Sequence, residues 1–314
     1  MQDFDFIIVG AGSAGCVLAN RLSENSAHRV LLIEAGGSDR RFWIRTPIGY
    51  GMTFLDESVN WKFEADRDPG LGGRDVYVPR GKVIGGSSSI NAMVYARGAK
   101  NDFDDWRDAG NPGWGWDEVK RAFEAIETRI TKDGIAEGNG PLTVSDRQND
   151  YPHLKRHFMN AAREAGLPLA DGHPSENFAC NGEEGFGPYV INTRKGLRCS
   201  SADAFLHPIK HRKNLTILTE AQVARILFDG KRASGVSYRK DGMVHAVKAR
   251  REVILSAGAI QSPQLLQLSG IGPGALLKEH NIEIIHANDG VGAHLEDHIG
   301  INYYYRAKEP TLNA

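Results

Sequence analysis

The first 35 residues alternate apolar segments with a helical pattern. Phe4–Val9 is a short apolar run, which is typical of a buried parallel strand. The apolar residues of segment 17–22 then fall on one face of a helix. A second strand is expected over residues 29–33 and ends at Glu34. This pattern predicts a strand-helix-strand unit at the start of an α/β fold.

The middle of the chain is expected to contain long loops and two helices. The spacing of apolar residues predicts amphipathic helices over residues 118–127 and 154–165. Segments 128–141 and 171–187 are rich in Gly, Asn and Asp, which predicts loops. Residues 42–75 lack periodicity and are rich in Gly, Pro and Asp, so we expect a long excursion over a ligand rather than a linker.

Short strands dominate the region after residue 214. The expected strands are residues 215–219, 222–228, 233–239, 244–249 and 252–256, with hairpin turns at Asp229-Gly230 and Asp241-Gly242. No internal repeat or low-complexity tract is present. We therefore expect one discontinuous α/β domain, residues 1–145 and 196–298. A second, inserted α+β domain would begin in residues 146–195 and 299–314.

Composition and charge exclude several classes of protein. The formal net charge of the 314 residues is −1, whereas a nucleic-acid binder needs a clustered cationic surface. No stretch reaches the ~18 apolar residues of a membrane-spanning helix, and the N-terminus lacks signal-peptide features. Cys16, Cys180 and Cys199 are odd in number and show no paired spacing. They suit a reducing compartment, so we expect a cytoplasmic protein, and we expect no metal.

The first strand leads into a glycine fingerprint, Gly10-Ala11-Gly12-Ser13-Ala14-Gly15. Gly10 permits a tight turn, Gly12 lets the backbone approach a pyrophosphate, and Gly15 lets the helix pack on the strand. The N-terminus of the helix then presents free N–H groups and its positive dipole end to the anion. The fingerprint therefore predicts a dinucleotide site.

Glu34 ends the second strand, nineteen residues after Gly15. This is the place of the acid that binds an adenosine ribose 2′-hydroxyl, and its charge disfavours a 2′-phosphate. We expect Asp39 to lie in a nearby loop with no part in cofactor binding. The fingerprint serves NAD and FAD alike, so it leaves the choice between them open.

A second glycine-rich segment, residues 79–98, carries the cations Arg80 and Lys82 near its start, the pair Gly85-Gly86 and three serines, and can line an elongated anionic ligand. A third covers residues 256–272. Residues 81–104 and 258–272 resemble the two signatures of the glucose-methanol-choline oxidoreductases, flavoproteins that oxidise alcohols. Further landmarks resemble the family at Asn60-Trp61, residues 113–116, 198–203 and 235–238, and Asp297-His298. Within the family, the chain is most similar to the choline-dehydrogenase-like bacterial branch.

The resemblance implies a Rossmann-like FAD-binding domain (residues 1–145 and 196–298) and the start of a substrate-binding domain, incomplete in this chain. It also implies the residues that contact FAD. These are Gly10, Gly12, Ser13, Ala14, Gly15, Glu34, Ala35, Trp61, Arg80, Lys82, Gly85, Gly86, Ser87, Asn91, Ala92, Met93, Val94, Val223, Ala257 and Gly258. Val223 would meet the adenine, and residues 91–94 would lie beneath or beside the isoalloxazine. By themselves, Val223 reads as a core residue and Lys82 as a solvated charge.

Two positions depart from the family pattern. Some members attach FAD covalently through a histidine that precedes the residue matching Asn91, and this chain has Ile90 there. Isoleucine has no nucleophile, so we expect non-covalent FAD. His294 and Glu296 stand where relatives usually carry Asn and Gln, and we interpret His294 as a structural residue.

The reaction implied by the resemblance is oxidation of an alcohol by hydride transfer to flavin N5, with oxygen or a quinone as electron acceptor. It needs a base, commonly a histidine near the C-terminus. The family's base motif has no match here, so the catalytic residues stay unknown and the base is expected beyond Ala314. His207-Pro208 resembles part of that motif but lies upstream of its place.

Three interpretations differ in class. The first is an FAD-dependent alcohol oxidoreductase, and the second is a non-catalytic FAD-binding fragment or one half of an assembly with a companion C-terminal chain. The third, an NAD-dependent dehydrogenase, leaves the Gly85-Gly86 segment without a purpose.

Overall fold

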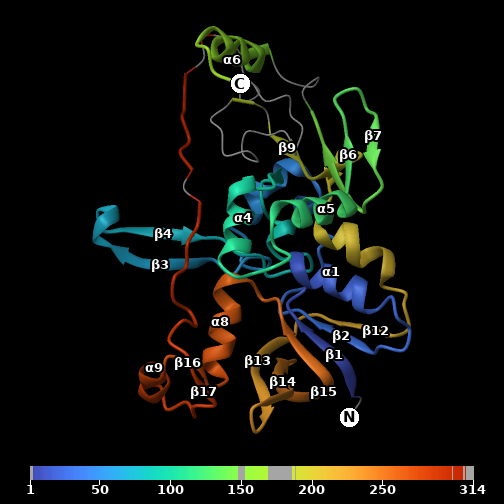
Figure 1. Cartoon of the computed structure of the whole chain (residues 1–314), viewed down its shortest axis with the longest axis vertical. Helices are drawn as coiled ribbons and strands as arrows, with labels where there is room; N and C mark the ends of the chain where they lie inside the picture. The colour runs from blue at the N-terminus through green and yellow to red at the C-terminus, as the bar shows by residue number, and fades with distance from the viewer. Residues whose placement is uncertain are drawn as a thin grey trace. The chain divides into compact units, whose positions relative to one another are not determined.

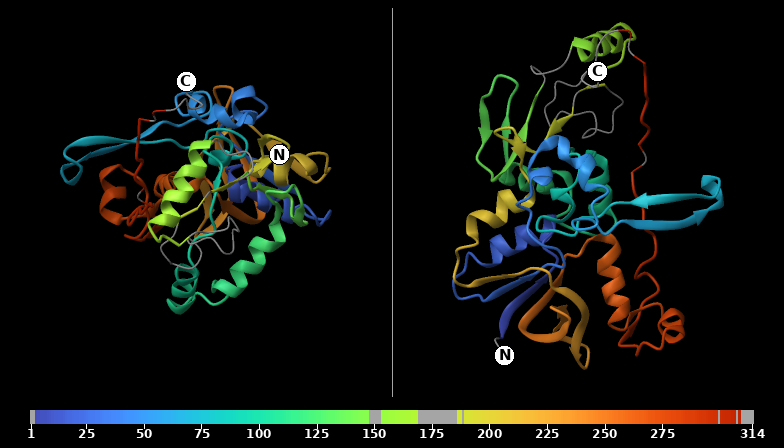
Figure 2. Two further views of the ribbon diagram at one scale, coloured as in Figure 1. Left: turned by 90° about the horizontal axis from the view of Figure 1, so that it is seen from above. Right: turned by 180° about the vertical axis from the view of Figure 1, so that it is seen from behind.

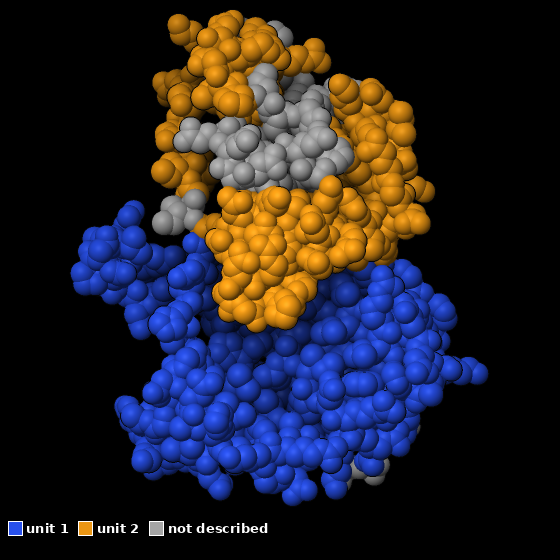
Figure 3. All heavy atoms as spheres, viewed as in Figure 1, with its two compact units in different colours: residues 1–92, 200–297 blue, residues 93–199, 298–314 orange. Residues whose placement is uncertain are grey.

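The structure is a computed structural model, and it describes residues 3–147, 153–168, 186, 187, 189–298, 300–306 and 308. The chain divides into two compact units (Figure 3). Unit 1 comprises residues 1–92 and 200–297, and unit 2 comprises residues 93–199 and 298–314. This division differs from the expected domains mainly in residues 93–145, which fall in unit 2. The reason is hydrogen bonding, because strands of this segment pair with strands near residue 190 in one sheet.

Unit 1 contains a six-stranded sheet of order β12-β2-β1-β15-β14-β13 (Figure 1). Its strands are β1 Phe4–Val9, β2 Val30–Ile33, β12 Leu215–Leu218, β13 Gln222–Asp229, β14 Arg232–Lys240 and β15 Met243–Leu255. β12, β2, β1 and β15 pair in parallel, whereas β13, β14 and β15 pair antiparallel. The expectation of two strands over 244–249 and 252–256 is wrong. A single strand, β15, pairs with β14 along its first half and with β1 along its second.

The core of unit 1 lies on this sheet. Every residue of β1 and β2 is buried, as the continuous apolar runs predict. An apolar cluster that includes Ile7, Leu31 and Val236 joins the parallel strands to the antiparallel ones. Helix α1 (Ser13–Leu22) buries Gly15, Cys16, Ala19 and Asn20. The expected α/β class is therefore confirmed.

The segment after β2 is more regular than expected. Residues 42–75 contain helices α2 (Phe42–Arg45) and α3 (Tyr50–Thr53) and the strand β3 (Phe63–Asp68), which pairs with β4 (Arg74–Val78). This hairpin extends away from the sheet of unit 1 (Figures 1 and 2). The remaining elements of unit 1 are 3-10 helices at Pro47–Gly49, Pro69–Leu71, Gly86–Ser89 and His207–Ile209, a π-helix at Ala202–Leu206, α8 (Gly258–Leu268), β16 (Ile271–Gly272), α9 (Gly274–Glu279) and β17 (His286–Ala287).

Unit 2 contains a five-stranded sheet of order β5-β9-β8-β6-β7. Its strands are β5 Val94–Tyr95, β6 Glu127–Ile130, β7 Ala136–Gly138, β8 Leu142–Ser145 and β9 Val190–Ile191, and β10 (Thr193–Arg194) pairs with β11 (Leu197–Arg198). Its helices are α4 (Lys100–Asp108), α5 (Trp116–Ile126) and α6 (His153–Glu164). The two amphipathic helices are thus confirmed. The loop expected over 128–141 is wrong, because this segment forms a hairpin of β6 and β7. The loop expected over 171–187 lies, except for residues 186 and 187, outside the described residues.

Candidate cofactor-binding site

The glycine fingerprint forms the turn between β1 and α1. The backbone of Gly10 has a φ of +97°, and a Cβ there would lie 2.6 Å from the Ser256 carbonyl oxygen. A Cβ on Gly15 would lie 1.9 Å from the carbonyl oxygen of Gly10. The roles expected for these two glycines, a tight turn and close packing of the helix, are confirmed.

The N-terminus of α1 is open to a ligand. Gly12 is the N-cap residue in an extended conformation, and no side chain of the described residues caps this end. Ser13 and Ala14, the first helical residues, line a cavity. Uncapped N–H groups at a helix N-terminus favour an anion through hydrogen bonds and the helix dipole.

The second glycine-rich segment meets the fingerprint directly. The Gly85 N–H donates to the Ala11 carbonyl oxygen at 2.7 Å. A Cβ on Gly86, where φ is +53°, would lie 2.7 Å from the Cα of Gly12. Two glycine-rich segments about seventy residues apart in the sequence therefore make one surface.

A cavity of about 740 Å³ lies along this surface, within unit 1. It falls in the upper part of the range of roughly 300 to 1,000 Å³ typical of small-molecule sites. Of the residues expected to contact the cofactor, those that line it are Gly10, Gly12, Ser13, Ala14, Glu34, Ala35, Trp61, Arg80, Gly86, Ser87, Val223, Ala257 and Gly258. Gly15, Lys82, Gly85, Asn91, Ala92, Met93 and Val94 are absent from its lining.

Glu34 is buried at the end of β2 and holds two backbone amides. Its Oε2 accepts a hydrogen bond from Ala11 N–H and its Oε1 accepts one from Gly36 N–H, each at 2.8 Å. Burial raises the pKa of this carboxyl, while the two amide hydrogen bonds and the Lys82 charge oppose the rise. Each carboxylate oxygen can accept a second hydrogen bond, so a ribose hydroxyl can still be bound. Glu34 therefore also joins the fingerprint to the loop after β2.

Lys82 and Trp61 form a pair beside the cavity. The Lys82 Nζ lies 4.8 Å from the centroid of the Trp61 ring, a cation–π distance. Trp61 N–H donates to the Arg80 carbonyl oxygen at 2.8 Å, so its backbone pairs with the glycine-rich segment. Lys82 is thus a partly buried, packed residue rather than a freely solvated charge.

The residues expected near the isoalloxazine divide between the two units. Asn91 and Ala92 belong to unit 1 and are exposed, and Asn91 N–H donates to the Ser87 carbonyl oxygen. Met93 and Val94 belong to unit 2, where Met93 is buried and Val94 is 46% exposed. Ile90 is 1% exposed and packs in an apolar cluster with Ile44, Val59 and Val83. Their contacts to a flavin stay a prediction.

The cavity also has lining residues that the sequence analysis missed. The main ones are Ala221 just before β13, Gln222 on β13, Arg239 on β14, and Gln261, Ser262 and Gln264 on α8. Gln222 pairs with Arg239 across β13 and β14, next to Val223. Part of this signal lies in the sequence, because α8 falls within the glycine-rich segment 256–272, whose expected FAD contacts include only Ala257 and Gly258.

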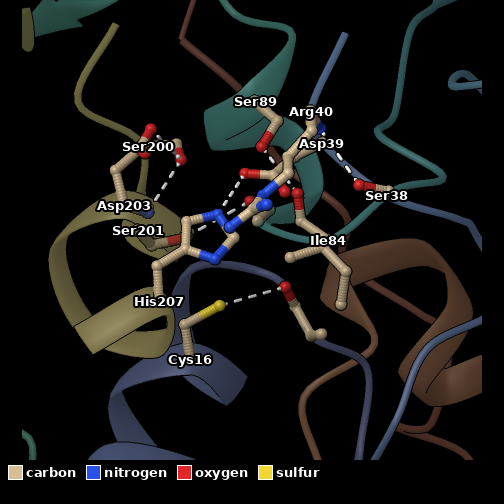
Figure 4. Close-up of polar contacts among 12 residues, drawn as sticks. Cys16, Ser38, Asp39, Arg40, Ile84, Ser89, Ser200, Ser201, Asp203 and His207 are labelled. Carbon is tan, nitrogen blue, oxygen red and sulfur yellow. Dashed lines mark hydrogen bonds and ion pairs between the residues drawn. The ribbon is translucent and has the colours of Figure 1, made fainter. Parts of the chain in front are cut away.

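The structure also places two further polar residues that the sequence analysis discussed, Asp39 and His294. Asp39 lies in the loop after β2, as expected, but it is only 5% exposed and its Oδ2 pairs with the Nε2 of His207 at 2.8 Å (Figure 4). The sequence alone could not show this pairing, because His207 lies 168 residues away. His294 is exposed and has a φ of +58°. Asp39, Asp203 and His207 each offer one metal-ligand atom, all within 4.8 Å of one another.

Four parallel strands, a helix N-terminus facing a cavity and an acid at the end of the second strand together define a dinucleotide-binding domain. Residues 4–300 match the family model described as GMC oxidoreductase, and the chain belongs to this family, the glucose-methanol-choline oxidoreductases.

Proteins similar in sequence and in structure agree with this family assignment. The chain is 42% identical to oxygen-dependent choline dehydrogenase of Photobacterium profundum, over 99% of this chain and 54% of that protein. It is 43% identical to alcohol dehydrogenase (acceptor) of Pseudomonas putida, over 98% of this chain and 55% of that protein. Pyridoxine 4-oxidase from Mesorbium loti superposes with a TM-score of 0.82 at 38% identity, covering 91% of this chain and 55% of that one. The chain spans about half the length of these relatives.

FAD is the cofactor of this domain. An FAD-dependent oxidoreductase from Chaetomium thermophilum superposes with a TM-score of 0.83 at 33% identity, over 92% of this chain and 51% of that one. The residues fit a dinucleotide for two reasons. A Cβ on Gly86 would clash with Gly12, so glycine is needed where the two segments that line the cavity meet. The uncapped N-terminus of α1 also faces the cavity. No helix in the described part of the chain is both long and apolar enough to cross a membrane.

Cys16 provides a test of the packing beneath this site. Its thiol is fully buried and donates to the Ala11 carbonyl oxygen at 3.2 Å. Burial raises the pKa of this thiol to about 12, so at pH 8 only about one molecule in ten thousand carries the thiolate. We expect iodoacetamide to leave Cys16 unmodified in the native protein and to modify it in urea, as measured by peptide mass spectrometry. Rapid native labelling would contradict the packing of α1.

Proposed function

We propose that this chain supplies the FAD-binding part of an enzyme that oxidises an alcohol, a CH–OH donor, to an aldehyde or ketone. The observation that carries the proposal is the cavity in which the fingerprint, Glu34 and the Gly85-Gly86 segment meet. Relatives named as choline dehydrogenase, alcohol dehydrogenase and pyridoxine oxidase support the alcohol class of substrate. When bound, FAD would accept a hydride at flavin N5.

The chain's own residues would bind and orient the cofactor. The N–H groups of Ser13 and Ala14 would hold the pyrophosphate, Glu34 the adenosine ribose, and the Val223 backbone the adenine. Arg80, which lines the cavity, would add positive charge. Unit 1 would be the FAD-binding domain, and unit 2 would begin the substrate-binding domain.

The base that removes the hydroxyl proton would come from residues beyond Ala314. His207 is held by Asp39 and is absent from the cavity lining, and His298 belongs to unit 2. Oxygen or a quinone would take the electrons from the enzyme. A cytoplasmic location is supported by the cysteines Cys16, Cys180 and Cys199, which are odd in number and show no paired spacing in the sequence.

The proposed function is tested by anaerobic mixing of the FAD-loaded protein with choline and with simple and aromatic primary alcohols. Flavin absorbance is followed for the 314-residue chain and for the same chain extended by its reading frame or joined by a companion chain. We expect bleaching only in the second case, because proton transfer contributes typically 10²- to 10⁴-fold. Equal bleaching by the short chain would place the base within it. Binding of FAD without bleaching in either case would favour the non-catalytic alternative.

We expect the bound FAD to be released completely by acid precipitation. Ile90 occupies the position of covalent attachment and has no nucleophilic atom, and it is buried among apolar side chains. The measurement is the flavin absorbance of the supernatant and of the washed pellet. Yellow colour that stays with the pellet would contradict the prediction.

A further inference from the structure

Asp39 and His207 tie two distant segments of unit 1 together. The His207 ring donates through Nε2 to Oδ2 of Asp39 at 2.8 Å, with the aspartate side chain 6% and the histidine side chain 25% exposed (Figure 4). His207 begins the 3-10 helix 207–209, directly after the buried π-helix Ala202–Leu206. A carboxylate in this position would be costly to bury without its donor.

Asp39 lies in the loop between β2 and α2, and the part of it over residues 34–39, called loop 34–39, packs directly on the glycine-rich segment. A Cβ on Gly36 would lie 1.9 Å from the Lys82 carbonyl oxygen. Gly37 bridges to Val83, and the Ile84 N–H donates to the Gly37 carbonyl oxygen at 3.0 Å. The other end of the loop is Glu34, in the cavity lining. A displacement of the loop therefore moves both Glu34, which is expected to bind the ribose, and the backbone that leads to Gly85-Gly86.

The segment that carries His207 also makes hydrogen bonds to the glycine-rich segment of residues 79–98. The Ser201 N–H donates to the Ser88 Oγ at 3.0 Å, and the two serine hydroxyls are 2.8 Å apart. The Ser88 Oγ in turn donates to the Gly85 carbonyl oxygen at 2.6 Å. Ser201 and His207 flank the π-helix, whose residues 202 and 204–206 are buried. The buried π-helix thus connects the two contacts.

We propose that His207 is a positioning residue for FAD binding: through Asp39 it holds loop 34–39 against residues 82–84, so that Glu34 and Gly86 face the same cofactor. The proposal rests on the proposed function of the cavity. The pair lies outside the cavity lining, so its effect on FAD is transmitted by the loop rather than by contact.

The test compares three variants of the FAD-free protein, each titrated with FAD by fluorescence quenching. His207→Leu removes the donor, His207→Gln keeps an N–H donor near the position of Nε2, and His211→Leu changes an exposed histidine of the same segment. EDTA is present throughout, because Asp39, Asp203 and His207 could otherwise share an added metal ion. Hydrogen exchange of the Ile84 amide is measured on each variant without FAD.

We expect His207→Leu to raise the Kd for FAD roughly tenfold and to speed exchange of the Ile84 amide, whereas His207→Gln and His211→Leu stay within about threefold of the parent. The circular dichroism of the bound flavin should also change in His207→Leu alone. A merely structural role would lower the melting temperature while leaving Kd and this spectrum unchanged, and that result would overturn the proposal. So would a glutamine variant as weak as the leucine variant. If the parent itself binds no FAD, the proposed function fails, and the positioning role fails with it.

Discussion

Replacing Gly86 by alanine should weaken FAD binding by about 1 to 3 kcal/mol, or roughly 5- to 150-fold in Kd. The added Cβ would lie 2.7 Å from the Cα of Gly12, and neither atom is the movable end of a side chain. The two glycine-rich segments must then separate, and the cavity they form loses its shape. Calorimetric titration of the FAD-free protein with FAD measures the effect.

Gly230→Ala is the matched control for this change. Gly230 has a φ of +58°, close to the +53° of Gly86, but a Cβ there would have no heavy atom within 4 Å. Both variants therefore carry the same backbone cost, about 1 to 2 kcal/mol for a left-handed conformation. Only the Gly86 variant should lose FAD affinity. Equal losses in both variants would show that backbone strain, rather than the approach of Gly12, is responsible.

Glu34→Ala should weaken FAD binding by about 1.5 to 3 kcal/mol through loss of a charged hydrogen bond. The structure adds a second effect. Ala11 and Gly36 lose the acceptor of their amides, so the free energy of unfolding of the FAD-free protein should also fall, by about 1 to 3 kcal/mol for each amide left unsatisfied. Urea unfolding without FAD and calorimetric titration with FAD separate the two effects.

The control for Glu34 cannot be Asp39, which is buried and paired with His207. Glu24 is a better choice, since its side chain is 50% exposed and it makes only a surface ion pair with Arg21 among the contacts described. Glu24→Ala should change stability by less than about 0.5 kcal/mol and leave FAD affinity unchanged. An unaltered Kd in Glu34→Ala would remove Glu34 from the cofactor site.

Patterns within one stretch of chain predicted the local structure well. β1, α1 and β2 follow from continuous apolar runs around a glycine turn, and α5 and α6 follow from one apolar face. The hairpin of β6 and β7 was missed, because its Gly, Asn and Asp residues resemble those of a loop. The same composition suits both, since a hairpin so short has few apolar positions of its own.

What the sequence determined by itself was the chemistry of the cofactor site. Gly10, Gly12, Gly15 and Glu34 lie within 25 residues of one another, so chain geometry alone sets their spacing. Only the tertiary structure decided which distant groups join them. Gly86 meets Gly12, and Gln222 and Arg239 line the same cavity. His207 is paired with Asp39 rather than placed in the cavity lining. These contacts depend on how β15 inserts beside β1 and how the segment of residues 200–207 packs beneath the glycine-rich backbone, which no local periodicity encodes.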